Sequence, residues 1–358
     1  GLAMAHHGDY CWLSAPYGVW RAKLTQQSLD LTDDVLSVRE ELAESGGQLV
    51  VELRNDDGSY ASPGSGDLAI LDIGCQLEFS PGYRTPVGNE SSPGQAFTLD
   101  AYEHTSSGGK ASLVLYASDA WSLIKSWRAR HQFRWNKATN EACVKDILGL
   151  VLARVGLKLE VKSQSSVITS FYPDFTIHPN NRGDMVIARL LSFVPDVLFI
   201  EGNRAYLVNP LATDSSVYSY GASHPILEGK YRRGTLEPNR VQVEGYDPQA
   251  GEPVVVDSFA WDEIGKLCDI LLQLEDRDID AVTKARQRGE AYLRKAGIES
   301  ASGAIRIPVN CGQQLYDVVD ITDNRAGLGG EKRRVLGLAL LYHPRRREYE
   351  MRLSLGAV

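Results

Sequence analysis

The sequence lacks the features that mark membrane and secreted proteins. No apolar run approaches the roughly 20 residues that span a bilayer, and no basic segment followed by an apolar one opens the chain. We therefore expect neither membrane insertion nor secretion. Cysteines are few, odd in number and never in a CxxC pair: Cys11, Cys75, Cys143, Cys268 and Cys311. This distribution favours reduced thiols in a cytoplasmic setting and argues against a zinc knuckle.

Signatures of catalysis and of phosphate binding are also scarce. The 46 acidic residues outnumber the 38 basic ones, and the net charge of −8 argues against a protein that grips phosphates tightly. The cluster Gly327-Leu328-Gly329-Gly330-Glu331-Lys332 lacks the spacing of a phosphate-binding loop. In Gly221-Ala222-Ser223-His224-Pro225, proline replaces the second glycine of a nucleophile elbow. No HExxH pair occurs, and we expect no catalytic residue, no cofactor and no metal site.

The C-terminal part of the chain contains predicted strands with one solvent-exposed face. Apolar and polar residues nearly alternate at 305–309 and 315–321, as a strand with one solvated face requires. After a turn rich in glycine, residues 334–342 and 348–355 predict a hairpin across His343-Pro344-Arg345-Arg346-Arg347. This segment therefore predicts a β-unit.

A similar pattern occurs earlier, at residues 96–116. Phe97 and Leu99 alternate with polar residues before a glycine-containing turn and a return strand. A constant shift of 240 residues places Tyr102 on Tyr342, Leu113 on Leu353 and Leu115 on Leu355. The pattern suggests an internal duplication. The alternative, that any two amphipathic hairpins look alike, stays open.

The middle of the chain has a helical period. Apolar spacing predicts helices at 119–133, 140–155, 183–194, 258–274 and 279–296, and strands at 167–177, 216–220 and 241–244. Residues 197–208 predict a tight hairpin that turns through Glu201-Gly202-Asn203-Arg204. Residues 29–44 fit a strand or a helix. Together these patterns predict an α+β protein of two or three domains.

Several motifs also carry a resemblance to a known family. They are the run Leu53 to Tyr60 (LRNDDGSY) leading to Gly74 to Gly82 (GCQLEFSPG), the run Asp174-Phe175-Thr176-Ile177 with Arg189-Leu190-Leu191 after it, and the run Leu315 to Asp323 (LYDVVDITD). In their order and spacing the chain resembles the hub proteins of phage tail tips and baseplates, which are similar to proteins of gene transfer agents and contractile injection systems. None of these motifs is catalytic.

The resemblance implies an architecture and a set of partners. It implies two similar antiparallel β-barrel (tube) domains joined by an α+β connector: 1–117 for the first barrel, 118–213 with 251–301 for the connector, and 214–250 with 302–358 for the second. Three chains would form a ring that connects the tail tube to the tip or spike. The expected partners are the chain itself as a homotrimer, the tail tube, distal tail and spike proteins, and DNA only in transit. The expected location is the virion tail, assembled in the host cytoplasm.

Basic clusters are the only candidate contact residues that the sequence offers. Arg345, Arg346 and Arg347, with Lys332 and Arg333, are predicted on hairpin loops, where a charged tip is common. Their functional interpretation is contact with an acidic neighbour in the tail or with passing DNA. Because acidic residues predominate, we expect a neutral or acidic lumen, with the arginines facing a protein neighbour or solvent.

Two other classes of function remain open at this stage. A tail-associated hydrolase of peptidoglycan or polysaccharide would need two carboxylates about 5 to 10 Å apart in a deep cleft, at no fixed sequence spacing. A free-standing carbohydrate-binding β-protein would need exposed aromatic side chains in a groove.

Overall fold

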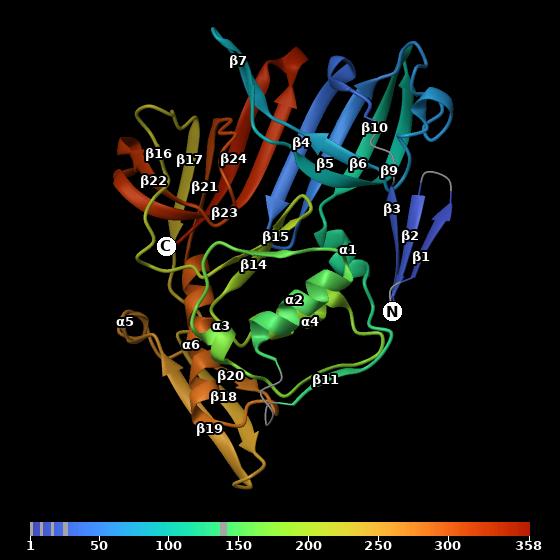
Figure 1. Ribbon diagram of the computed structural model, residues 1–358. Coiled ribbons are helices and arrows are strands. Elements are labelled where there is room, and N and C mark those ends of the chain that lie inside the picture. Colours follow the sequence, from blue (N-terminus) through green and yellow to red (C-terminus); the bar gives the residue numbers. More distant parts are fainter. Residues whose placement is uncertain (1–2, 8–9, 16–17, 24–27, 137–141) are drawn as a thin grey trace.

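The computed structural model describes residues 3–7, 10–15, 18–23, 28–136 and 142–358, and the fold is given for these residues (Figure 1). An 11-stranded sheet dominates it. Its main path runs β17 (Glu228–Arg233), β21 (Ala301–Pro308), β24 (Glu348–Gly356), β23 (Leu328–His343), β4 (Val35–Ala43), β5 (Gly46–Arg54), β10 (Lys110–Ser118), β9 (Gln95–Ser107) and β6 (Gln76–Phe79). Beside this path, β22 (Val318–Asp323) pairs with β23, and β16 (Tyr218–Tyr220) pairs in parallel with β22.

Two sets of five strands within this sheet share one topology. The first set is β4, β5, β6, β9 and β10, and the second set is β17, β21, β22, β23 and β24. In each set the spatial order is first, second, fifth, fourth, third, so β4-β5-β10-β9-β6 corresponds to β17-β21-β24-β23-β22. Every neighbouring pair within the two sets is antiparallel. The strand pairing therefore repeats in the two halves of the sheet.

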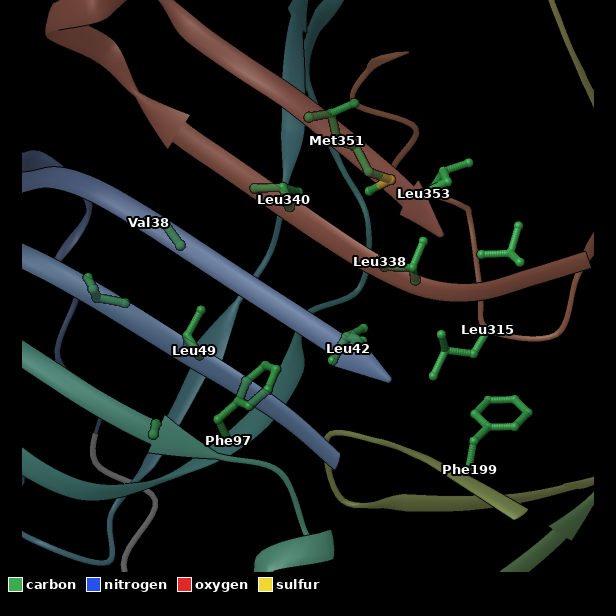
Figure 2. Packing of buried hydrophobic residues seen from close by; sticks show 14 of the residues in the cluster. Val38, Leu42, Leu49, Phe97, Phe199, Leu315, Leu338, Leu340, Met351 and Leu353 are labelled. Carbon is green, nitrogen blue, oxygen red and sulfur yellow. The ribbon is translucent and has the colours of Figure 1, made fainter. Parts of the chain in front are cut away.

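The expectation of two closed barrels is wrong. Strand β4 pairs with β23 of the second set, from Gly337 opposite Ala43 to Tyr342 opposite Val38, so the first set continues into the second instead of closing on itself. The two sets also bury one common apolar core. Figure 2 shows Val38, Leu42 and Phe97 of the first set gathered with Leu340 and Leu353 of the second.

The constant shift of 240 residues does not hold across both hairpins. Tyr102 lies opposite Leu115, whereas Tyr342 lies opposite Tyr349. The first hairpin turns through two glycines, Gly108 and Gly109, while the second turns through the longer segment from Pro344 to Arg347. Because the loops differ in length, one offset does not align both strands of each hairpin.

A second apolar core lies outside the main sheet. Helices α2 (Val144–Arg154) and α4 (Gly183–Leu191) place their apolar stripes there, as their 3.6-residue period predicts. Around them lie α1 (Trp121–Ser126), the two-stranded sheet of β11 (Phe133–Trp135) and β13 (Phe175–Ile177), and the three-stranded sheet of β12 (Leu159–Val161), β14 (Val197–Glu201) and β15 (Arg204–Val208). The long strand expected at 167–177 is instead a short helix, α3 (Val167–Ser170), followed by β13.

A second small sheet lies at the end of the molecule farthest from β7 (Figure 1). It consists of β18 (Arg240–Asp247), β19 (Glu252–Phe259) and β20 (Leu271–Glu275), with α6 (Val282–Glu299) packed on β18 and β19. Gly289 permits this approach, because a Cβ there would lie 2.5 Å from Ser258 Oγ. The helix expected at 258–274 is wrong: the segment forms the single turn α5 (Trp261–Ile264) and strand β20.

Two further β elements lie outside the main sheet. Strands β7 (Gly82–Thr85) and β8 (Gly88–Ser91) form a hairpin inserted between β6 and β9. Tyr83 anchors it on the second set, since its hydroxyl donates to the Val309 carbonyl at 2.6 Å and its ring lies edge-on to Tyr349 at 5.2 Å. Strands β1 (Ala3–His7), β2 (Tyr10–Ala15) and β3 (Gly18–Lys23) form a separate meander. No described helix is both long and apolar enough to cross a membrane.

Candidate assembly surfaces

Two strands of the main sheet have an unpaired edge segment: β17 at one end of the sheet, and β9 beside the terminal strand β6 at the other. Among the described strands, β17 pairs only with β21. Strand β9 pairs with β10 over most of its length, but β6 covers its other edge only from Gln95 to Thr98. Residues 100–107 of β9 are exposed and have no further strand partner among the described residues. A free edge of this length favours pairing with another strand.

The two free edges carry opposite charge. On β9 the exposed edge segment contains Asp100 and Glu103 and no lysine or arginine. On β17, Lys230 and Arg232 are exposed and form no ion pair within the described residues, while Glu228 is paired with Arg306 at 3.3 Å. The free segment of β9 is therefore acidic, and the free edge of β17 is basic.

The three consecutive arginines lie where the sequence predicts. Arg345 and Arg346 belong to the single 3-10 turn η5 (Pro344–Arg346), and Arg347 follows with a left-handed φ of 56°. All three are exposed, and none makes an ion pair with a described residue. The side chains are therefore free for a partner.

Lys332 and Arg333 do not lie on a loop. Both belong to β23, opposite Asp320 and Val319 of β22. Arg333 is buried and pairs with Glu331 at 2.8 Å, while the Lys332 ammonium donates to the Asp214 carbonyl. The prediction of a second charged loop tip is wrong, because strand β23 extends through these residues.

The neighbouring Arg334 is a buried charge that sequence reasoning missed. Only 1% of it is exposed, and its guanidinium contacts Asp214 Oδ2 at 2.8 Å and the carbonyls of Tyr316 and Leu211 at 3.0 Å each. Tyr316 itself has a φ of 66°, which is uncommon for a bulky residue. The three contacts fix β23 against the segment from Leu211 to Asp214 and against Tyr316.

The polar face of the sheet carries ion pairs. Arg39 and Glu41 are ion-paired along β4. Arg306 on β21 lies 2.7 Å from Glu350 on β24 and bridges to Glu228 on β17. These carboxylates weaken the attraction of Arg39 and Arg306 for phosphates.

A cleft of about 550 Å³ lies on this polar face beside α1. Its buried carboxylate, Asp119, accepts hydrogen bonds from the backbone amides of Gly47 at 2.5 Å and Trp121 at 3.0 Å. Burial raises the Asp119 pKa to about 7. Its other carboxylate, Glu41, is ion-paired to Arg39. Both acidic groups are therefore engaged in structural contacts. Within the described residues, no group of three or more His, Cys, Asp or Glu could hold a metal ion.

One acidic residue lies in the common core. Glu40 is 7% exposed between Val38 and Leu42 on the apolar face of β4, opposite Leu340 of β23. Burial, assisted by the nearby charge of Glu201, raises the pKa of Glu40 to about 7. A carboxyl group therefore lies at the β4–β23 pairing, which is the seam between the two strand sets.

Comparison with solved structures places this architecture among phage tail proteins and related secretion-system proteins. A tail protein from Neisseria meningitidis matches with a TM-score of 0.66 over 90% of this chain and 92% of that chain, at 10% identity. A 43 kDa prophage tail protein from Shewanella oneidensis gives a TM-score of 0.63 over 90% and 93%, at 11% identity. A type VI secretion component from E. coli, described as similar to the T4 tail proteins gp27 and gp5, gives 0.54 over 91% and 74%, at 11% identity.

At the level of sequence, no family model and no curated protein matches the chain. The identities near 10% show a shared fold, and this confirms the resemblance to tail hub proteins at the level of the fold.

Proposed function

We propose that this chain is a non-enzymatic structural component of a phage or phage-like tail tip or baseplate. The observation that carries the proposal is the doubled five-strand sheet with unpaired edge segments on β9 and β17, in a fold shared with tail proteins over about nine-tenths of both chains. In this role three copies form a ring that connects the tail tube to the tip or spike. The six strand sets of such a ring approximate the sixfold symmetry of a tube.

The polar face of the sheet suits the wall of the ring's lumen. DNA in transit has to slide, and each unmatched cation would hold a phosphate. The ion pairs of Arg39 with Glu41 and of Arg306 with Glu350 lower the cost of that passage. Arg345, Arg346 and Arg347 then face a protein neighbour, for which an acidic surface of the adjoining tail component is the partner we propose.

Electron microscopy of particles that carry a tagged copy of this chain tests the proposal. We expect the tag at the tail tip or baseplate, and we expect particles lacking the chain to have no completed tip. A tag found in the capsid or along the whole tube, or complete tips without the chain, would contradict the proposed role.

A further inference from the structure

The seam between the two strand sets is a template for a second junction. In the seam, the first strand of the first set, β4, pairs antiparallel with the fourth strand of the second set, β23. Because both sets have the same strand order, the corresponding elements are β17, the first strand of the second set, and β9, the fourth strand of the first. Both corresponding strands lack this partner within the described chain.

The lengths of the two fourth strands support the correspondence. Strand β23 uses Leu328 to Arg334 to pair with β22 and Gly337 to Tyr342 to pair with β4. Strand β9 likewise uses its first part to pair with β6 and leaves residues 100–107 without a partner on that edge. The free part of β9 therefore corresponds to the part of β23 that pairs with β4.

Charge supports the same match. The free edge of β9 presents Asp100 and Glu103, and β17 presents Lys230 and Arg232. Two copies of β9, or two copies of β17, would bring like charges together, whereas β9 with β17 brings opposite charges together. Cross-strand pairs of opposite charge favour pairing, and like charges oppose it.

We propose that residues 100–107 of one copy pair antiparallel with β17 (Glu228–Arg233) of the next copy. The inference rests on the proposed ring and names the strands that join it. Each copy contributes one edge of each kind, so the contact is head-to-tail and repeats until the ring closes. Half of the junctions are then the β4–β23 seams within chains, and the other half are β9–β17 pairs between chains.

Disulfide trapping tests this pairing directly. One batch of the full chain carries Thr105→Cys on β9 and another carries Lys230→Cys on β17. Under mild oxidation we expect a covalent dimer in the mixture and little in either batch alone. Asn89→Cys on the exposed strand β8, mixed with Lys230→Cys, is the matched control and should give no excess dimer over the native cysteines.

Charge reversal provides the second measurement. By analytical ultracentrifugation, we expect Lys230→Glu with Arg232→Glu to weaken self-association at least tenfold. Adding Asp100→Lys and Glu103→Lys should restore it. The control Arg54→Glu with Arg352→Glu makes the same charge change on the central strands β5 and β24, and it should leave association within about twofold of the wild type.

The outcomes separate the junction from the ring and from the tail role. A wild-type trimer that is unaffected by the β17 reversal and gives no Thr105–Lys230 crosslink overturns the junction but keeps the ring. A wild-type chain that neither associates nor crosslinks at any accessible concentration also overturns the junction. Neither result bears on the location of the tagged chain in the particle, which is the separate test of the proposed function.

Discussion

The two strand sets have one topology but different surroundings. In the second set, residues 337–342 of the long strand β23 are covered on both edges, by β24 on one side and by β4 on the other, and β22 pairs with the first part of the strand. In the first set, the corresponding strand β9 is left open over residues 100–107. The repeated framework therefore specifies where the strands lie, whereas the partners at each edge specify whether a contact is made within the chain or outside it.

The inserted segments differ in the same way. Between its third and fourth strands the second set has a short turn, with Gly327 in the left-handed region at a φ of 73°. At that position the first set carries the β7–β8 hairpin, which reaches across and anchors on the second set through Tyr83. The first set thus contributes strand β4 and this hairpin to its contact with the second set.

Core truncations on the corresponding strands β10 and β24 should have the largest effect and test whether the two sets are one folding unit. Leu113 on β10 and Leu353 on β24 are both fully buried in the common core. We expect Leu113→Ala and Leu353→Ala each to lower the free energy of unfolding by about 2–5 kcal/mol. Both should shift the same transition in chemical denaturation followed by circular dichroism. Two separate transitions, each sensitive to only one variant, would show that the sets fold independently.

The next effect concerns the buried ion pair, which only the second set contains. Asp214→Ala leaves the Arg334 guanidinium buried with two backbone carbonyls as partners. We expect a loss of about 2–3 kcal/mol of stability, below the usual range for a broken buried pair because those carbonyls remain and Asp214 is one-third exposed. Asp320→Ala, on the neighbouring strand, is the control. A loss below about 1 kcal/mol for Asp214→Ala would mean that Asp214 contributes little to holding Arg334.

Features with a local sequence signal could be predicted, whereas contacts between distant segments could not. The alternation at 348–355 and the i, i+3, i+4 spacing of α2 and α4 are local signals, and the predicted hairpin and helices are confirmed. The β4–β23 seam has no local signal, because it joins strands about 300 residues apart. Arg334 looks like part of an exposed basic run, since its carboxylate partner lies 120 residues earlier in the chain. Strand β20 was missed because its leucines fit a helix equally well.

Glu40 allows the seam to be examined through pH. In an unfolded chain its pKa is near 4.5, and in the folded protein burial raises that pKa to about 7. Below about pH 4.5 the group is protonated in both states and costs nothing. Between about pH 4.5 and 7 the folded state keeps a proton that the unfolded state has lost, so the free energy of unfolding falls as pH rises.

Glu40→Gln should therefore be more stable than the wild type at pH 8, by no more than about 3 kcal/mol, and equal to it near pH 4. Denaturation at several pH values measures this difference. Glu41→Gln, the adjacent residue on the polar face, should change stability by less than about 0.5 kcal/mol at every pH because Glu41 is exposed. A constant difference between Glu40→Gln and wild type across pH would contradict a raised pKa at the seam.

The two hairpin tips should give the smallest effect on folding and the clearest division of roles. The first tip is Gly108-Gly109, and the second carries Arg345, Arg346 and Arg347. Changing the three arginines to serine removes exposed charges that have no ion-pair partner within the described chain. We expect stability to stay within about 0.5 kcal/mol of the wild type, and self-association to be unchanged because the tip is not part of either free edge. Incorporation of the chain into tails should fall, because an acidic neighbour loses its counter-charge.

DNA binding at about 0.15 M salt distinguishes this contact from a nucleic-acid contact. At that ionic strength the charges are screened over about 8 Å, but direct phosphate contacts remain strong. We expect the isolated protein to bind duplex DNA weakly, in keeping with the net charge of −8 and the paired arginines of the polar face, and the serine variant to differ little. Tight binding with a steep salt dependence that disappears in the serine variant would reassign the tip to DNA. In that case the difference between the two tips would concern the passage of DNA, and the partner on this side of the ring would have to be held by other residues.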